Sequence, residues 1–518
     1  ADHIMDATGV LTNRKEIFTK TMMRRYEQAK KSYETPVIIV TQDEAEAASK
    51  GNVKATRTWK FKAENVRDYG FATSRRYIWD MMAVKMGDKD VMAVSLYPPE
   101  GNPLWEQWST KAVASTLKSY SRMTFDYPYH KAISVHAKRQ GMEYPMICFN
   151  FGRPDEDGTY SDRTKKGMLG VIIHEVGHNF FPMIVNSDER QWTWMDEGLN
   201  SFLDGVAGRE WDPTIPWGVE PRDITGYMKS STQVPIMTQS DSVLRLGPNA
   251  YTKPAAALNI LRETILGRDL FDFAFKEYAQ RWKYKRPTPA DFFRTMEEAS
   301  GVDLDWFWRG WFYSTDHVDI SLDHVYKLRL DTEDPDIDFS RQRDTEMDKP
   351  LSLTDERNKT EGIELWVDRN EDVSDFYDEN DRFTVTNKER NKYRKFINEL
   401  DPWEKRVFER AVKEDKNYYV LDFSNKGGLV MPIILELEFE DGSVDDMYIP
   451  AEIWRRTPKT VSKLIVTEKG KVLKSVTVDP RWETADVDVE NNHYPRRIIP
   501  SRIEAYKSES DTSVLRRH

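Results

Sequence analysis

The sequence contains little cysteine and histidine, and it lacks long apolar runs. Its single thiol, Cys148, excludes an intrachain disulfide framework, and its apolar neighbours predict a buried, unreactive side chain. No stretch approaches the roughly twenty apolar residues of a membrane-spanning helix. Acidic residues outnumber basic ones, 87 to 76, and give a net charge of −11. This negative charge disfavours nucleic acid as a partner. At 39% hydrophobic and 12% aromatic residues, the 518-residue chain can bury sizeable cores.

Two of the nine histidines carry the strongest signal in the chain. His174 and His178 lie four residues apart in an apolar stretch that predicts a buried helix. At about 100° per residue, positions i and i+4 face the same side of a helix, so both imidazoles can bind one metal ion. Glu175 is turned away from this direction and can act on a water beside the metal. Glu197 lies at the start of a second predicted helix and is the candidate third ligand.

Two histidines and one carboxylate leave a coordination position open for water, which is typical of catalytic rather than structural zinc. We therefore predict one Zn²⁺ ion per chain. The alternative is a buried helix with two structural histidines, and the position of Glu197 argues against it.

Two further residues have both a structural and a functional interpretation. Glu143 is a lone carboxylate in the apolar sequence GMEYP, where an unpaired buried charge would be costly. It is either an edge-strand residue in water or, beside a metal, a group that binds a substrate ammonium. Tyr251 precedes a helix of small residues, and it is either a packing residue or a phenol at the edge of a cleft.

The chain changes character after about residue 320. Two acidic tracts, residues 331–338 and 368–381, lack the spacing of calcium ligands and are interpreted as solvated surface. Residues 388–416 form a charged stretch with a helical pattern. Alternating apolar residues beyond 430, with turns between them, predict a small β-sandwich. Residues 304–313 are so aromatic that we expect them to fill a core.

With these residues in hand, the chain resembles the aminopeptidase N family of gluzincin zinc metallopeptidases. The resemblance rests on HEVGH followed after eighteen residues by Glu197, on GMEYP, and on YTKPAAAL, and it covers residues 59–313. It implies that His174, His178 and Glu197 bind zinc and that Glu175 is the general base. It also implies that Tyr251 stabilises the transition state. The substrate's free α-amine would be bound by the motif Gly141, Met142 and Glu143.

The resemblance implies an α+β fold built on a thermolysin-like catalytic domain, mostly helical with a small β-sheet. We expect residues 1–70 to be the remainder of an N-terminal β-domain and residues 71–318 to be the catalytic domain. Residues 319–518 would be an acidic and helical region followed by the β-sandwich. The resemblance implies a divergent bacterial member, since the C-terminal region resembles only such members, and we expect the N-terminal portion of the family to be missing. We expect it in the bacterial envelope or secreted, with the cytoplasm as the alternative.

The predicted function is zinc-dependent removal of the N-terminal residue from peptides, and the predicted partners are peptides with a free N-terminus. A zinc endopeptidase is one alternative, and Glu143 argues against it because an internal peptide has no ammonium group to pair with. A catalytically silent binding protein is the other, and the intact Glu175 and Tyr251 argue against it. Asp196 and Pro254 depart from the residues common in the family, which puts side-chain preference in question more than chemistry.

Overall fold

A mixed six-stranded sheet, in the order β3-β6-β7-β8-β10-β9, lies at the N-terminal end of the molecule. The computed structural model describes residues 2–51, 53–138, 141–215, 218–373 and 375–497. The strands of the sheet are β3 (Val37–Val40), β6 (Ile78–Met86), β7 (Lys89–Tyr97), β8 (Lys131–His136), β9 (Met142–Tyr144) and β10 (Ile147–Asn150). β6 and β7 form an antiparallel hairpin, and β8 is parallel to both β7 and β10. β9 is an edge strand antiparallel to β10, and it carries Glu143.

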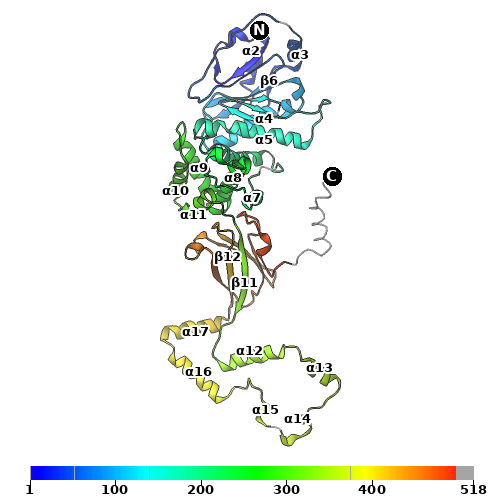
Figure 1. Ribbon diagram of the computed structural model, residues 1–518, viewed down its shortest axis with the longest axis vertical. Coiled ribbons are helices and arrows are strands. Elements are labelled where there is room, and N and C mark those ends of the chain that lie inside the picture. Colours follow the sequence, from blue (N-terminus) through cyan, green and yellow to red (C-terminus); the bar gives the residue numbers. More distant parts are fainter. Residues whose placement is uncertain (1, 52, 139–140, 216–217, 374, 498–518) are drawn as a thin grey trace.

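Helices cover both faces of this sheet (Figure 1). The covering helices are α2 (Lys20–Ala29) and α4 (Leu104–Met123). Side chains of β6 alternate between the two faces, as a pleated strand requires. Trp79 and Met81 belong to the core that also contains residues of α2, and Ile78 and Met82 belong to the core that contains residues of α4. The sheet is therefore buried on both sides.

The first 70 residues are tied closely to the sheet. Besides α2 and β3, they form β1 (Ile4–Ala7), β2 (Val10–Leu11), α1 (Arg14–Ile17), α3 (Gln42–Lys50) and β4 (Phe61–Lys62). The next strand, β5 (Phe71–Ser74), pairs with β1. Strand β3 pairs with β6, and the buried Asp6 of β1 forms an ion pair with Lys131 of β8. The predicted domain boundaries at residues 70 and 318 stay predictions. The hydrogen bonds between β3 and β6 join residues on the two sides of the first boundary.

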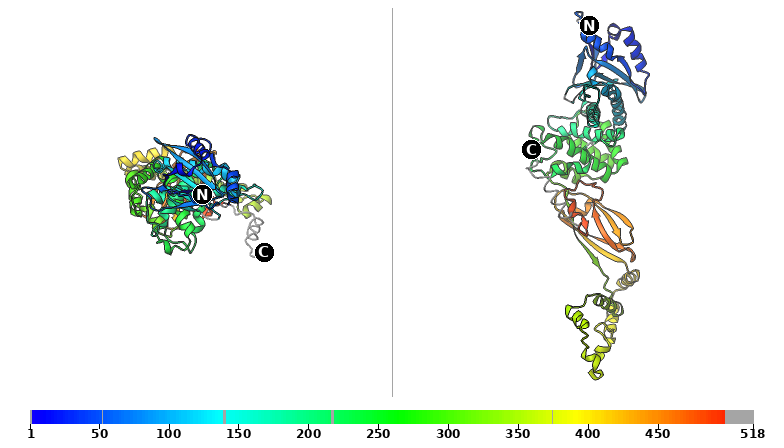
Figure 2. Two further views of the ribbon diagram at one scale, coloured as in Figure 1. Left: turned by 90° about the horizontal axis from the view of Figure 1, so that it is seen from above. Right: turned by 90° about the vertical axis from the view of Figure 1, so that its right-hand side faces the viewer.

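A helical region follows the sheet along the long axis of the molecule (Figure 2). Its elements are α5 (Asp162–Gly177), η2 (Asn179–Ile184), η3 (Trp194–Gly198), α6 (Leu199–Trp211), α7 (Pro221–Met228), η4 (Ser240–Ser242), η5 (Gly247–Thr252), α8 (Lys253–Ile260), η6 (Leu261–Ile265), α9 (Arg268–Trp282), α10 (Pro289–Ser300) and α11 (Asp305–Tyr313). The short segment η1 (Pro99–Gly101) belongs to the sheet region, where it joins β7 to α4. In α11, Phe307, Trp311 and Phe312 are fully buried, which confirms that this aromatic segment fills a core.

Two β-sheets come next and share one core. The first contains β11 (Ile320–Leu328), β12 (Asn417–Asn425) and β15 (Thr460–Thr467), and the second contains β13 (Ile433–Phe439), β14 (Val444–Ile449), β16 (Leu473–Val478) and β17 (His493–Tyr494). Short segments η8 (Ala451–Arg455) and η9 (Val489–Asn491) connect their strands. Buried residues of both sheets, such as Leu421 and Leu435, belong to the same cluster. The α+β organisation ending in a two-layer β region is as predicted.

The connection from β11 to β12, residues 329–416, is an arm that extends away from the sheets (Figure 1). Its elements are α12 (Pro335–Met347), α13 (Leu353–Thr360), α14 (Trp366–Arg369), η7 (Glu371–Val373), α15 (Phe376–Glu379), α16 (Asn387–Glu399) and α17 (Pro402–Glu414). The charged stretch predicted as helical is two helices, because Pro402 starts a new one after the capping residue Asp401. Most described side chains of the arm are exposed or half-buried. Of the helices that the structure describes, none has the length and apolar character needed to cross a membrane.

Because the arm buries so little, we expect it to be dispensable for folding. Leu328 and Tyr418 are paired across β11 and β12, so a short turn in place of residues 331–415 can close the hairpin. We expect the unfolding temperature of this variant to stay within about 4 °C of the full chain, measured by calorimetry. Trp454→Ala, which empties a buried site, is the control for sensitivity and should lower it further. A variant that fails to fold would show that the arm is part of the core structure.

Candidate metal centre

Three side chains converge on one point at the end of α5. The Nε2 atoms of His174 and His178 lie 3.0 Å apart. An oxygen of Glu197, from η3, lies 3.1 Å from Nε2 of His174 and 3.3 Å from Nε2 of His178. The two imidazoles therefore face the same side of the helix, as their spacing predicts, and Glu197 reaches them from the next helical segment. This group can hold a metal ion.

The other nitrogen of each imidazole is already engaged. Nδ1 of His174 lies 2.8 Å from a carboxylate oxygen of Asp204 in α6. Nδ1 of His178 lies 2.9 Å from the carbonyl oxygen of Phe181 and 3.0 Å from a carboxylate oxygen of Asp196. Since these partners accept hydrogen bonds, each Nδ1 keeps its proton, and a metal ion that displaces the second proton of the ring binds the lone pair of Nε2. That is the tautomer a metal ligand needs, held in place by its outer partners.

A second group of potential ligands shares His178. Its members, Glu143, His178 and Asp196, have ligand atoms within 4.8 Å of one another. Nδ1 of His178 is the nitrogen that faces Asp196, and it donates to the carbonyl of Phe181. A nitrogen that carries a proton cannot bind a metal, so the first group fits an ion better. Two imidazoles and one carboxylate are the donor set of catalytic zinc.

The charge around the histidines also favours a cation. Burial would lower the pKa of His174, but hydrogen bonds to Asp204 and Glu197 raise it to about 10. Burial likewise disfavours the charged form of His178, yet Glu197 and Asp196 raise its pKa well above its usual value. Buried carboxylates thus outnumber the groups that can balance them, and a positive ion at the point of convergence would offset their charge.

Close packing of three helices fixes the position of α5. A Cβ atom at Gly177 would lie 2.3 Å from both the hydroxyl of Tyr120 in α4 and the side-chain oxygen of Asn200 in α6. The Asn200 amide donates to the backbone carbonyl of His174 (2.8 Å), and the Tyr120 hydroxyl donates to Asn200 (2.9 Å). Only glycine allows this approach, so Gly177 is needed for the histidines to meet the ligand on the crossing helix.

A second glycine brings Tyr251 to the site. A Cβ atom at Gly198 would lie 2.5 Å from the ring of Pro254 and 2.8 Å from the carbonyl oxygen of Ala250. The segments η5 and α8 therefore pack directly on the segment that carries Glu197. Pro254 forms part of this contact.

Tyr251 lies beside the first metal ligand. Its ring is stacked on that of His174, with centroids 5.8 Å apart and planes inclined by 22°. Burial and the charge of Glu197 raise the pKa of its phenol above the usual range. The hydroxyl therefore stays a hydrogen-bond donor at neutral pH.

Glu175 is nearly enclosed, with 6% of its surface exposed. A Cβ atom at Gly141 would lie 2.2 Å from one of its carboxylate oxygens, so the backbone of Gly141 packs directly against it. The other oxygen, Oε2, has no hydrogen-bond partner among the described residues. Burial raises the pKa of Glu175 to about 7. The group can therefore both accept and release a proton near neutral pH.

The edge strand β9 places Glu143 at the other side of the histidines. Glu143 is half-buried and lies beside His178 and Asp196. Met142 and Tyr144 flank it, and alternation along the strand turns their side chains to the opposite face. The structure thus brings together every predicted site residue except the side chain of Met142, which is 37% exposed.

Asp204 is the site residue that the sequence analysis missed. It follows Glu197 by seven residues, which is about two helical turns, so both carboxylates lie on one face of the chain leading into α6. This spacing was the available signal. It places one carboxylate on the metal side of His174 and the other on its outer nitrogen.

We expect Asp204→Asn to weaken zinc binding about 10- to 100-fold, because the carboxylate charge is lost and the amide NH2 can donate to Nδ1, which favours the wrong tautomer of His174. The measurement is zinc affinity by competition with a chelator. Glu210→Gln removes a charge from an exposed position of the same helix and should leave the affinity unchanged. Equal affinity in the Asp204 variant and the wild type would contradict this role.

Comparison with known proteins agrees with the metal motif. Residues 108–311 match the Peptidase family M1 domain. The chain is 23% identical over 233 residues to the mitochondrial aminopeptidase 2 of Saccharomyces cerevisiae, covering 41% of this chain and 24% of that protein. It is 25% identical over 234 residues to the glutamyl aminopeptidase of Bos taurus, covering 42% and 24%. The chain thus matches about a quarter of the length of these relatives.

Solved structures give similar matches at low identity. An M1 zinc metallopeptidase from Deinococcus radiodurans matches with a TM-score of 0.44 and 14% identity, over 61% of this chain and 62% of that one. Aminopeptidase A of Legionella pneumophila matches with a TM-score of 0.44 and 12% identity, over 79% and 36%. The matched domain spans α5 and α6, which carry the metal ligands and their outer partners. Residues 108–311, with the HEVGH motif and the third carboxylate, are therefore similar to the Peptidase family M1 domain and to the aminopeptidases that match this part of the chain.

Proposed function

We propose that the protein is a zinc-dependent aminopeptidase that hydrolyses the bond after the first residue of a peptide. The observation that carries this proposal is the position of Glu143 beside the metal ligands. Glu143 and Asp196 offer carboxylate oxygens within 4.8 Å of each other, in a partly buried place. Two neighbouring carboxylates are stabilised by a cation between them. The α-ammonium of a peptide is such a cation, and it exists only when the N-terminus is free.

The metal ligands supply the second part of the proposal. A zinc ion held by His174, His178 and Glu197 would activate water as a nucleophile and polarise the scissile carbonyl. Glu175 takes a proton from the attacking water and later gives it to the leaving amine. Its raised pKa suits both steps, because a group that titrates near 7 is an effective base and an effective acid at neutral pH.

Tyr251 acts on the developing negative charge of the scissile carbonyl. Its ring is fixed against His174, which holds the hydroxyl on the same side as the metal ligands. A donor in place before the reaction stabilises the transition state by roughly 3–4 kcal/mol. Glu143 meanwhile sets the register, because pairing with the ammonium leaves only the first carbonyl next to Glu175.

Glu175→Gln should bind zinc normally and lose hydrolysis by a factor of about 10² to 10⁴, since the amide cannot take the proton. Zinc content and the rate on an aminoacyl amide are measured on the same preparation. His174→Ala, which removes a ligand, is the control and should lose both. If Glu175→Gln keeps more than about a tenth of the rate, Glu175 is not the base.

Peptides with a free N-terminus should be cut and their N-acetylated counterparts should not, because acetylation removes the charge that Glu143 pairs with. Glu143→Gln should lower the rate on free peptides by about tenfold or more, with unchanged zinc content. Glu156→Gln, in an exposed loop, is the matched control. Cleavage of acetylated peptides at internal bonds would instead favour an endopeptidase.

A further inference from the structure

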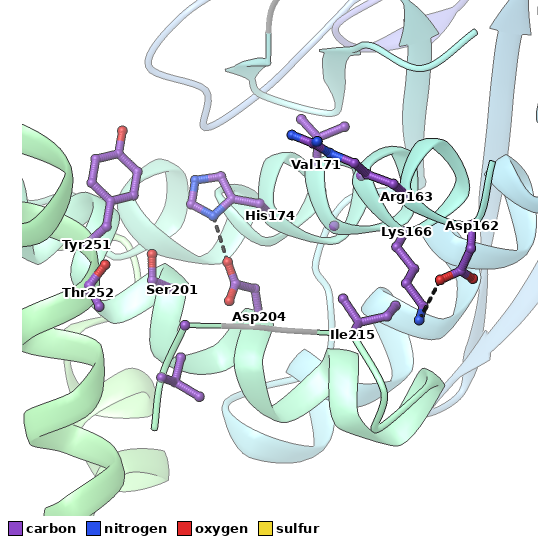
Figure 3. A pocket seen from close by; sticks show the side chains of 14 residues that line it. Asp162, Arg163, Lys166, Val171, His174, Ser201, Asp204, Ile215, Tyr251 and Thr252 are labelled. Atoms are coloured by element: carbon purple, nitrogen blue, oxygen red, sulfur yellow. Dashed lines mark hydrogen bonds and ion pairs between the residues drawn. The ribbon is translucent and has the colours of Figure 1, made fainter. Parts of the chain in front are cut away.

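A cavity of about 720 Å³ begins at His174 and follows α5 away from the metal centre (Figure 3). His174 and Tyr251 line one end, and Lys166 and Asp162 line the other. Between them the wall is formed by successive turns of one face of α5, since Arg163, Lys166, Gly170 and His174 are spaced three or four residues apart. The cavity is thus a channel leading from the metal ligands toward the start of the helix.

The direction of this channel identifies which part of a substrate enters it, if the proposed function holds. Glu143 lies beside His178 and Asp196, at the C-terminal end of α5. The channel runs from His174 toward the N-terminal end of the same helix. A peptide whose ammonium pairs with Glu143 and whose first carbonyl lies at the metal ligands therefore extends its remaining residues into the channel. This part is the leaving group of the reaction.

The far end of the channel is positively charged. Lys166 pairs with Asp162 at 2.8 Å, so its charge is partly balanced. Arg163 lines the same end, is exposed, and has no ion pair or hydrogen bond within the part of the chain that the structure describes. The carboxylate of Asp204, which also lines the channel, is engaged by His174. An anion entering from the metal side therefore meets its first uncompensated positive charge at Arg163.

We propose that Arg163 binds a carboxylate of the leaving part of the peptide. Guanidinium groups bind carboxylates through paired hydrogen bonds. Lys166 and Arg163 precede His174 by eight and eleven residues, which is about 12 and 16 Å along the helix. An extended peptide advances about 3.3 Å per residue. The side chain of Arg163 extends along the helix toward Val171, which is toward the metal end (Figure 3). The carboxylate thus belongs to a residue about two to four positions beyond the cut bond.

Two sources of this carboxylate are possible. In a short peptide of about three to five residues it is the C-terminal carboxylate. In a longer peptide it is an aspartate or glutamate side chain near the fourth residue. Both present the same group to Arg163, and peptides of defined length separate them.

The test uses the full chain with zinc and alanine peptides of two, four and six residues, each as free acid and as C-terminal amide. We expect amidation to lower kcat/KM of the tetrapeptide about fivefold, as expected for loss of an exposed charge pair. Amidation should have little effect on the hexapeptide. In the amidated hexapeptide, glutamate in place of glutamine at position four should raise the rate by a similar factor only if side chains are also accepted.

Two variants decide whether the cavity residues are responsible. The Arg163→Gln variant should hydrolyse the acid and the amide tetrapeptide with equal kcat/KM. Lys165→Gln is the matched control, because Lys165 lies on the same turn but its ammonium covers the Trp108 ring, 3.9 Å from the centroid, outside the cavity. It should keep the fivefold preference. Affinity of the two tetrapeptides for the Glu175→Gln variant, measured by calorimetry, gives a readout without turnover.

The outcomes separate this inference from the proposed function. Equal cleavage of acid and amide tetrapeptides by the wild type overturns the carboxylate subsite while leaving the aminopeptidase intact. Equal loss of the preference in Arg163→Gln and Lys165→Gln overturns it too, since surface charge would then explain the effect. Failure to release the first residue from any peptide overturns the proposed function, and this inference with it.

Discussion

The site depends on the hydrogen bonds that occupy the outer nitrogens of two histidines. Asp204 holds His174, and the Phe181 carbonyl with Asp196 holds His178, so both Nε2 atoms point to one place. This arrangement gathers carboxylates in a buried volume, which is costly unless a cation offsets them. The cluster is therefore built for a positive ion, and its geometry and electrostatics lead to the same conclusion.

Glycines set how closely the surrounding segments approach. Gly177 lets α4 and α6 lie against α5, Gly198 lets η5 and α8 lie against the segment that carries Glu197, and Gly141 lets the backbone beside β9 enclose Glu175. At each position a Cβ atom would lie 2.5 Å or less from a neighbouring atom. The raised pKa of Glu175 follows from such an approach, because burial is its main cause. Backbone packing thus determines the protonation chemistry that we propose.

Sequence reasoning predicted the parts of the site that local periodicity encodes. Helical spacing placed His174 and His178 on one face, and the start of a second predicted helix offered Glu197. The family resemblance decided between the two interpretations of Tyr251. Asp204 was missed, although its spacing from Glu197 was readable, because nothing local says which histidine a carboxylate will meet. The channel along α5 and the pairing of β3 with β6 join residues distant in the chain, and periodicity does not encode such contacts. The break at Pro402 was a local signal that could have been used.

Anomalous diffraction at the zinc edge, from crystals of the full chain grown with zinc, tests the central claim most directly. The account predicts one ion bound by Nε2 of His174, Nε2 of His178 and the carboxylate of Glu197, with Asp204 still hydrogen-bonded to His174. A zinc ion bound instead by Glu143, His178 and Asp196 would contradict it. So would the absence of an anomalous peak at this cluster.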